Sequence, residues 1–556
     1  SSLGLDISRT SDESFLPKYY LNGTDQVTNA KVGRGVGQRD YWVFENYLSY
    51  NDKFGDHTVS TMVGTSAEKE RYETVNASKE GLVNNDANQQ IINAATKNPA
   101  ASGSVSYHTM NSYFGRVFYS YADKYMITAN IRWDGSSNFA DKHRWGVFPS
   151  VSGGWNFREE SFIKDVVGDW FSQGKFRAAW GEIGNQNISS GAYLTRYGNS
   201  TYYLLGNSMT PWLSGGRTNV GNPDLRWETT RQLDFGLDLA FFNSALKFNI
   251  DYFDRKTSDM LVQVPMPAAI GLPNTPWSNA GSVKNRGFEF VLDYHGKIGN
   301  DFSYNIAGNI STYKNKVLSL GGGTNIPGKT HLGNQVNTMI EPGKPIGYFY
   351  GYKMDGVFQT QEEINNYRGG PDNTIIMPTA EPGDLKFVDL NGDGKLGEED
   401  RTMIGNPHPD FTFGLTLSGE YKGFDLSMFF QGSVGNDILN ILKYDIYSGT
   451  GWYNAPKDIF DKFWTGPGST NENFAISANS RDNLTMSEWY IENGSYVRLK
   501  NVTLGYTFPK QWVQKLTVQN LRLFVAAQNL FTITSYSGLD PELGNSNPAF
   551  MGIDMG

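Results

Sequence analysis

Residues 113–133 read YFGRVFYSYADKYMITANIRW, and this stretch decides the fold. From Tyr125 to Trp133 every second residue is apolar, and Thr128, Asn130 and Arg132 lie between them. Successive side chains of a strand point to opposite faces, so a strand here has one apolar and one mostly polar face. A short polar segment, Ala122-Asp123-Lys124, separates it from an alternating run before it. The stretch therefore predicts two strands joined by a tight turn.

The same alternation recurs along the chain, and it gives about fifteen or sixteen candidate strands. The clearest pairs are 232–241 with 246–252, 288–294 with 302–310, 411–421 with 424–430, and 502–508 with 521–527. These runs have about nine to eleven residues, which suffices for a tilted strand to cross a bilayer, whereas strands of soluble sheets most often have about five or six.

The connections between the runs differ in length. Tight hairpins alternate with long polar excursions at 70–106, 185–225, 255–285, 355–410 and 436–495. Outer-membrane barrels have short periplasmic turns and long extracellular loops. We therefore predict an all-β fold, an antiparallel transmembrane β-barrel with long extracellular loops, of which 355–410 and 436–495 are two. The alternative for this pattern is a soluble β-sandwich or propeller.

Composition supports a barrel and excludes other classes. Aromatic residues make up 14% of the 556 residues, and there are 62 glycines, which suit strands and turns respectively. Mean hydropathy is -0.47, and no apolar stretch approaches the roughly 20 residues of a spanning helix. The chain has no cysteine, so no disulfide or thiolate site is possible, and its net charge of -9 argues against a nucleic-acid partner.

One motif has the spacing of a calcium loop. Asp389, Asn391 and Asp393 take positions one, three and five, and Gly394 takes position six, where the turn is tight. Lys395 at position seven would contribute its carbonyl, and Asp400 stands at position twelve in place of the more common glutamate. We predict a structural calcium ion that stiffens the loop. The alternative is a surface turn without a metal.

Aromatic residues in or beside the long loops are candidates for substrate binding, because sugar rings stack on aromatic faces. Packing among the loops or anchoring at the membrane interface is the alternative for each. Carboxylates and histidines are scattered without the spacing of a catalytic site, so we predict no enzyme activity. The aromatic candidates are Tyr202, Tyr203, Trp212, Trp277, Trp452 and Tyr453.

Several motifs, in order, are similar to the barrel of the SusC/RagA family of TonB-dependent outer-membrane transporters. They are Asn111–Arg116, Arg132–Ser137, Trp145–Trp155, Trp180–Gln186, Asn222–Glu228, Asn279–Gly281, Asn285–Glu289, Gly383–Phe387, Asp389–Gly394, Gly405–Pro407, Ser495–Asn501 and Ala527–Thr532.

The resemblance implies a bacterial outer-membrane barrel of about 22 strands with a plugged lumen. It also implies import of glycans or peptides beneath a SusD-like surface lipoprotein, driven by the TonB complex through the plug. We find no plug or TonB box here, and the closing strand is expected after Gly556. Residues 1–556 are therefore expected to be the C-terminal part of one barrel. An outer-membrane scaffold that docks surface lipoproteins or secreted proteins is a second hypothesis, and a soluble glycan-binding or glycan-cleaving β protein is a third.

Overall fold

The computed structural model describes most of the chain, and its residues fall into two compact units. One unit comprises residues 1–153, 180–230 and 259–279, and the other comprises 154–179, 231–258 and 280–556. The described residues are 1–205, 210–263, 275–321, 325–328, 330–331, 335–447, 454–476, 482–513, 518–544 and 547–555, without the side chains of 199–205, 210–216 and 330–331.

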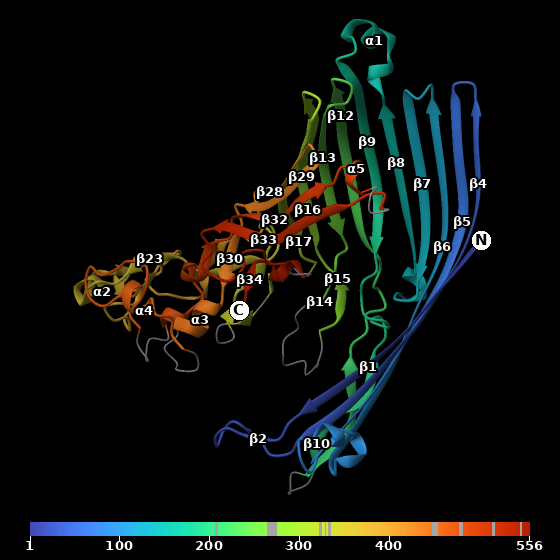
Figure 1. Ribbon diagram of the computed structural model, residues 1–556. Helices are drawn as coiled ribbons and strands as arrows, with labels where there is room; N and C mark the ends of the chain where they lie inside the picture. The colour runs from blue at the N-terminus through green and yellow to red at the C-terminus, as the bar shows by residue number, and fades with distance from the viewer. Residues whose placement is uncertain are drawn as a thin grey trace. The chain divides into compact units, whose positions relative to one another are not determined.

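The main element is a sheet of 15 strands, in which neighbours follow chain order once the small loop strands are passed over. Figure 1 draws β4 to β8 as adjacent long arrows. The strands are β1 (Ser2–Leu16), β4 (Lys31–Phe54), β5 (His57–Glu80), β6 (Lys97–Tyr121), β7 (Tyr125–Ser136), β8 (Trp145–Trp155), β9 (Phe171–Asn185), β12 (Glu228–Phe241), β13 (Leu246–Ser258), β16 (Ser282–Ile298), β17 (Phe302–Ser319), β28 (Phe411–Tyr421), β29 (Phe424–Val434), β32 (Tyr496–Thr507) and β33 (Arg522–Thr534).

Smaller strands and short helices occupy the connections. The strands are β2 (Tyr19–Tyr20), β3 (Gln26–Val27), β10 (Arg196–Leu205), β11 (Thr210–Asn219), β14 (Leu261–Gln263), β15 (Trp277–Asn279), β18 (Ile326–Pro327), β19 (Thr330–His331), β20 (Gln335–Val336), β21 (Thr338–Ile340), β22 (Tyr348–Tyr352), β23 (Met354–Val357), β24 (Arg368–Gly369), β25 (Thr374–Ile375), β26 (Leu385–Phe387), β27 (Arg401–Gly405), β30 (Asp437–Asn440), β31 (Ile491–Asn493) and β34 (Ile553–Asp554). The helices are α1 (Ser161–Val167), α2 (Gln361–Asn366), α3 (Leu442–Tyr447), α4 (Ile459–Lys462) and α5 (Lys510–Val513). Over the described ranges, no helix combines the length and the apolar character needed to cross a membrane.

The predicted hairpin turns are confirmed by the backbone. Ala122 and Asp123 have φ of 51° and 55°, and the Lys422-Gly423 turn has φ of 47° and 90°. Two consecutive positive φ values are the requirement of the type I′ turn, whose twist matches that of the flanking strands. The β6–β7 register then pairs Tyr121 with Tyr125 directly across the turn.

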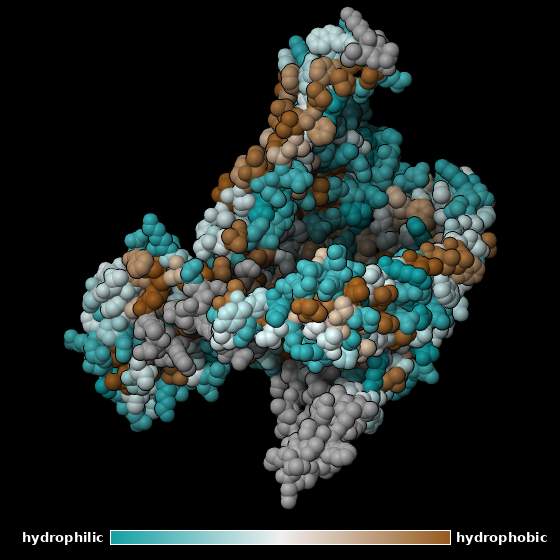
Figure 2. Space-filling model, turned by 60° about the horizontal axis from the view of Figure 1, so that its bottom comes forward, coloured by the Kyte–Doolittle hydropathy of each residue, from teal (hydrophilic) through white to brown (hydrophobic). Residues whose placement is uncertain are grey.

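Apolar side chains cover the exposed face of the sheet, which is the reverse of a soluble protein. On β7, Ile127 and Ile131 are 50% and 54% exposed. On the opposite face Asn130 donates a hydrogen bond to Ser150 Oγ over 3.1 Å. On the face seen in Figure 2, hydrophobic and hydrophilic residues reach the surface in separate patches. Such a sheet is stable when its apolar face lies in lipid.

Aromatic rings mark both ends of the apolar face in the first unit. Tyr113, Trp133 and Trp145 contact one another, with ring centroids 5.0–6.1 Å apart. Near the tight turns, Tyr121 and Tyr125 stack at 6.5 Å. Tyr125 and Trp133 are separated by roughly 26 Å along the strand at about 3.3 Å per residue. That spacing agrees with an apolar band of about 25 Å between two aromatic girdles.

One predicted excursion, 70–106, is wrong for most of its length. Strands β5 and β6 have 24 and 25 residues, so only residues 81–96 connect them. The sequence here is polar on both faces, and hydropathy alternation therefore gives no signal for a strand. The charges are instead neutralised between strands, as in the 2.6 Å ion pair of Arg39 with Glu70, which lets the hairpin continue.

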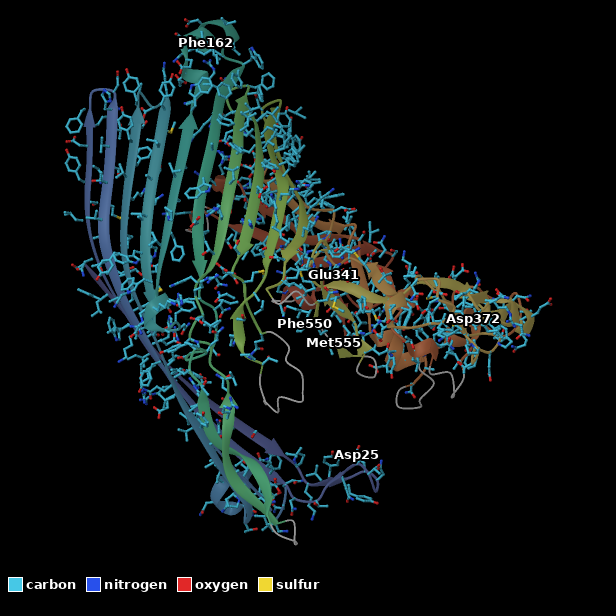
Figure 3. The ribbon with its side chains drawn as sticks, turned by 180° about the vertical axis from the view of Figure 1, so that it is seen from behind. Asp25, Phe162, Glu341, Asp372, Phe550 and Met555 are labelled. Carbon is cyan, nitrogen blue, oxygen red and sulfur yellow. The ribbon has the colours of Figure 1, made fainter. Side chains whose placement is uncertain are left out.

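The largest buried core lies outside the main sheet. We call the described parts of 335–410, 436–495 and 535–555 the loop body, and Asp372 marks its tip in the turn between β24 and β25 (Figure 3). The core residues of the loop body include Phe349, Phe358, Leu385, Phe387, Leu439, Ile441, Phe474, Met486 and Tyr490. Two predicted long loops, 355–410 and 436–495, both contribute to this core.

Candidate functional site: the polar sheet face and the loop body

The polar face of the sheet carries a charged network in the second unit. Arg177 of β9 donates from Nε and Nη2 to the Asp238 carboxylate of β12, both over 2.8 Å. Arg177 Nη2 also donates to Asp251 Oδ1 of β13 over 2.8 Å, and Asn249 Nδ2 donates to Asp238 Oδ1 over 2.7 Å. This face can therefore bind polar cargo through hydrogen bonds and fixed charge.

Gly236 makes room for this network. A Cβ at this position would collide with Asp251 Oδ1 and with the Arg177 guanidinium. With a Cβ there, the Arg177 and Asp251 side chains would have to shift, so glycine allows the side chains of β9 and β13 to meet across β12 as they do. The close packing explains why a glycine occupies a position that would otherwise weaken a strand.

A second charged cluster ties the segment after β33 to the sheet. Arg498 of β32, whose side chain is 7% exposed, pairs with Asp540 over 2.6 Å and with Glu542 over 2.7 Å. Lys500 pairs with Glu542 over 2.6 Å. The tie directs the segment toward β34, which pairs in parallel with β30 inside the loop body.

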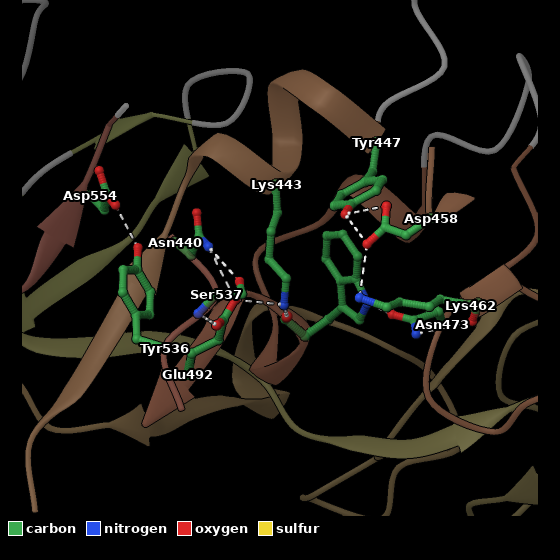
Figure 4. A network of polar contacts seen from close by, with 11 residues as sticks. Asn440, Lys443, Tyr447, Asp458, Lys462, Asn473, Glu492, Tyr536, Ser537 and Asp554 are labelled. Atoms are coloured by element: carbon green, nitrogen blue, oxygen red, sulfur yellow. Dashed lines mark hydrogen bonds and ion pairs between the residues drawn. The ribbon is translucent and has the colours of Figure 1, made fainter. Parts of the chain in front are cut away.

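A largely buried carboxylate, Glu492, joins several elements of the loop body (Figure 4). Glu492 of β31 accepts hydrogen bonds from Ser537 N and Oγ, both at 2.9 Å, and from Asn440 Nδ2 at 3.1 Å. Lys443 of α3 lies 3.2 Å from Glu492 Oε1 and donates to the Trp489 carbonyl over 2.7 Å. Three segments of the chain, 440–443, 489–492 and the one with Ser537, therefore meet at one charge.

The electrostatics of this pair favour a charged Glu492. Burial acts to raise the pKa of Glu492, but the Lys443 charge and the hydrogen bonds from Ser537 and Asn440 outweigh it, so the pKa is lowered. Burial also lowers the pKa of Lys443, against the opposing effect of Glu492. Glu492 has more partners than Lys443, so the network is best described as a carboxylate held by donors.

Aromatic residues pack beside this network and are part of the core. Trp489 contacts Phe474 and Tyr490, each with ring centroids 4.9 Å apart. Tyr447 donates to Asp458 over 3.0 Å, and burial together with that carboxylate raises the pKa of Tyr447 to about 12. Buried rings of this kind give the loop body a hydrophobic core of its own.

The six predicted substrate-binding aromatics have different outcomes. Trp277, in β15, packs against a small core formed by Phe139, Leu225 and Trp227, so packing rather than exposure describes it. Tyr203 pairs in register with Trp212, and Tyr202 with Leu213, in the β10–β11 hairpin. The side chains of Tyr202, Tyr203 and Trp212 lie outside the description. Trp452 and Tyr453 lie outside the described residues altogether.

The predicted calcium loop uses its side-chain oxygens to hold its own backbone. Asp389 accepts from Gly392 N at 2.7 Å and from Gly394 N at 2.8 Å, and Asn391 accepts from Asp393 N at 2.8 Å. Asp400 is fully buried and accepts from Leu390, Asn391 and Gly397 N–H groups at 2.8–3.2 Å.

Another side chain of the motif also holds the backbone of the loop. Asp393 accepts from Lys395 N at 2.9 Å. No group of three or more His, Asp or Glu residues arranged for a metal occurs among the described residues. A carboxylate oxygen that accepts one such hydrogen bond has a second lone pair, which can still bind an ion. Two of the expected ligands, the Asn391 amide and the Lys395 carbonyl, are not carboxylates. Calcium binding therefore stays a prediction.

Sequence reasoning found part of the charged network and missed the rest. Alternation places Asp238 and Asp251 on the polar faces of their strands, but nothing in the sequence pairs them with Arg177. The Lys443–Glu492 pair left no signal, because its members lie in two short elements, α3 and β31, that are far apart in the sequence of a long loop. A predicted loop that contains many large apolar residues as well as charged ones is typical of a folded unit with its own core. This composition could have indicated the loop body.

Comparison with known proteins agrees with the fold. The pattern of the family "TonB dependent receptor-like, beta-barrel" matches residues 2–530. TonB-dependent receptor P3 of Formosa agariphila is 35% identical over 543 residues, which are 94% of this chain and 52% of that protein. TonB-dependent receptor SusC of Bacteroides thetaiotaomicron is 30% identical over 511 residues, 89% of this chain and 47% of that protein. The chain thus spans about half the length of these relatives.

A solved structure shows the same fold. The structure of the RagAB peptide transporter superposes with a TM-score of 0.82 at 22% identity, covering 99% of this chain and 57% of that one. The predicted fold class, the outer-membrane location and the absence of an enzyme family are confirmed by these matches, and the soluble alternatives are wrong. The chain belongs to the TonB-dependent receptors, a non-enzymatic family, as a SusC/RagA-like portion of an outer-membrane β-barrel.

Proposed function

We propose that this chain forms barrel wall and extracellular loops of a TonB-dependent importer for glycans or peptides, together with a SusD-like surface lipoprotein. The observation that carries the proposal is the division of the sheet into an exposed apolar face and a hydrogen-bonded polar face, exemplified by Ile131 and by the Arg177 network. In a barrel the polar face lines a water-filled interior. The energy would come from the TonB complex, acting on the plug that the family resemblance implies.

The loop body supports a role for a partner at the cell surface. Its own core and the Glu492 network make it a preformed surface rather than a set of separate loops. The RagAB transporter is a structural neighbour of this chain, and SusC is a relative of it. The RagAB neighbour is a peptide transporter, which supports cargo of the peptide class. The glycan class rests on the family resemblance of the sequence, and the polar face suits either.

Uptake in living cells tests this proposal. The gene for the full-length protein would be deleted and restored on a plasmid, and uptake of fluorescent oligosaccharide and peptide pools would be measured with and without TonB. We expect one pool to enter only when both the gene and TonB are present, and a surface lipoprotein to co-purify.

The second hypothesis, a scaffold for surface lipoproteins or secreted proteins, gives a different result. A co-purifying surface protein with uptake of both pools unchanged by the deletion would support the scaffold and contradict import.

A further inference from the structure

A cluster of basic side chains lies on the apolar face of three strands in the second unit. On that face Tyr252 of β13 pairs with Phe288 of β16 in register, and their ring centroids are 5.1 Å apart. One step toward the long connections, the register aligns Asp254, Arg286 and Lys314, and the next step aligns Lys256, Lys284 and Lys316. Basic residues thus directly follow the aromatic end of the apolar face.

Most of these positive charges are not neutralised by the protein. Lys284 pairs with Asp254 over 2.7 Å. Lys256, Arg286, Lys314 and Lys316 are exposed, and none of the ion pairs found between described residues includes them. By contrast, Arg71 on β5 of the first unit pairs with Asp40 over 3.5 Å and also with Glu73.

The register opposes like charges at several positions, and Asp254, which lies opposite Arg286 and pairs with Lys284, offsets this repulsion only in part. Arg286 lies directly opposite Lys314, and Lys284 lies directly opposite both Lys256 and Lys316. Directly opposed residues of antiparallel strands have Cβ atoms about 4.5–5.5 Å apart, and like charges there are destabilising. An anion shared among these side chains would remove the repulsion.

The position on the strands identifies the kind of anion. The cluster is at the ends of β13, β16 and β17 that lead into long connections, whereas the opposite ends of β16 and β17 meet at a tight turn after Ile298. Long connections of outer-membrane barrels are extracellular, so the cluster faces the headgroups of the outer leaflet. A pocket of about 390 Å³ lies there, lined by Tyr252, Phe288, Arg286, Lys314 and Asp410 among others.

We propose that Lys256, Arg286, Lys314 and Lys316 bind a phosphate group of a lipopolysaccharide molecule in the outer leaflet, with Tyr252 and Phe288 against its acyl chains. Arg and Lys bind phosphate through charge-assisted hydrogen bonds, and arginine can do so with two parallel bonds. Basic residues near a membrane surface are attracted to anionic lipid. The proposal depends on the outer-membrane location but not on the import function.

Native mass spectrometry of the full-length protein in mild detergent tests this site. The probe is lipopolysaccharide from the source membrane, compared with the same material after chemical removal of its phosphates. The double variant Arg286→Gln/Lys314→Gln is expected to lower the ratio of bound to free protein roughly 30-fold. The control Lys247→Gln/Lys297→Gln removes the same charge from the opposite face of β13 and β16, and it should bind as the wild type does.

The remaining arms decide between the possible outcomes. Phosphate-free lipopolysaccharide should bind the wild type as weakly as intact lipopolysaccharide binds the variant. Equal binding of the two lipids, or undiminished binding by the variant, would overturn the proposal. Displacement by millimolar inorganic phosphate would show a site for free phosphate and would overturn it too. If the Arg286→Gln/Lys314→Gln protein does not migrate as a folded barrel on an unheated gel, the variant Lys256→Gln/Lys316→Gln is measured in its place.

Discussion

Gly236 is the residue on which the polar network depends most directly. A Cβ there would collide with Arg177 and Asp251, so Gly236→Ala should displace the arginine and destabilise the barrel by about 1–3 kcal/mol, as overpacking does. This effect is measured by heating the protein before gel electrophoresis and recording the temperature at which the band of the folded barrel is replaced by the band of the unfolded chain. Gly308→Ala is the control, because its Cβ would meet no atom closer than 3.7 Å. Equal transition temperatures for the two variants would contradict the role of Gly236.

The Lys443–Glu492 pair makes the loop body sensitive to acid in a defined direction. A carboxyl with a lowered pKa stabilises the fold above its unfolded pKa of about 4.3, and this contribution is lost as pH falls through the folded pKa. The lowered pKa of Glu492 therefore predicts that the wild-type loop body keeps its protection from hydrogen exchange down to about pH 4.

Lys443→Met removes the charge that lowers the Glu492 pKa and leaves burial, which raises it. We expect a local loss of about 3–5 kcal/mol, the usual effect of breaking a buried pair, and loss of protection at a higher pH than in the wild type. Lys462→Met is the matched control, because the Lys462 side chain is 64% exposed in its pair with Asp458 and exposed pairs contribute little. An unchanged pH profile for Lys443→Met would contradict the assignment.

At the scale of elements, the segment after β33 is expected to depend on Arg498. Arg498→Gln breaks its pairs with Asp540 and Glu542, so β34 should lose its register with β30, and hydrogen exchange of 536–555 should increase at least roughly 10-fold. Arg522→Gln breaks the Arg522–Asp425 pair, whose arginine side chain is 38% exposed, and should leave that segment unchanged. Similar exchange in both variants would show that Arg498 does not hold the segment.

The calcium prediction concerns the loop 389–400. If the ion binds, adding calcium after chelation should slow hydrogen exchange of that loop in the wild type and in Asp372→Asn, a nearby change outside the motif. Asp393→Asn should abolish the response without unfolding the loop, whereas Asp400→Asn should loosen it even without calcium, because Asp400 accepts three backbone hydrogen bonds. No response to calcium in the wild type would make the loop a metal-free turn.

Alternation of polarity was enough to predict the spanning parts of the strands and their tight turns, as in Tyr125–Trp133. It failed where both faces are polar, as in 70–80 of β5, because the strand is held there by ion pairs between neighbours. The core of the loop body could not be predicted either. Its residues, such as Phe349, Leu439 and Tyr490, come from segments far apart in sequence, and only tertiary packing brings them together.

At the scale of the whole molecule, the account rests on a sheet whose apolar face lies in lipid and whose long connections lie outside the cell. The 556 residues contain no cysteine, so single cysteines can report on each position. Ile131 and Asn130 lie on opposite sides of β7, so labels at these two positions distinguish the apolar face of the sheet from the polar face. Asp372 and Asp123 test the two ends, because one lies at the tip of the loop body and the other in a tight turn.

The most direct measurement is labelling of single-cysteine variants of the full-length protein, freed of any other cysteine, in its own outer membrane. The account predicts that a membrane-impermeant maleimide labels Asp372→Cys in intact cells but Asp123→Cys only after the membrane is opened. A fluorophore on Ile131→Cys should be quenched by lipid-borne nitroxide, and one on Asn130→Cys should not. Labelling of Asp123→Cys in intact cells, or quenching at Asn130→Cys and not at Ile131→Cys, would contradict the account.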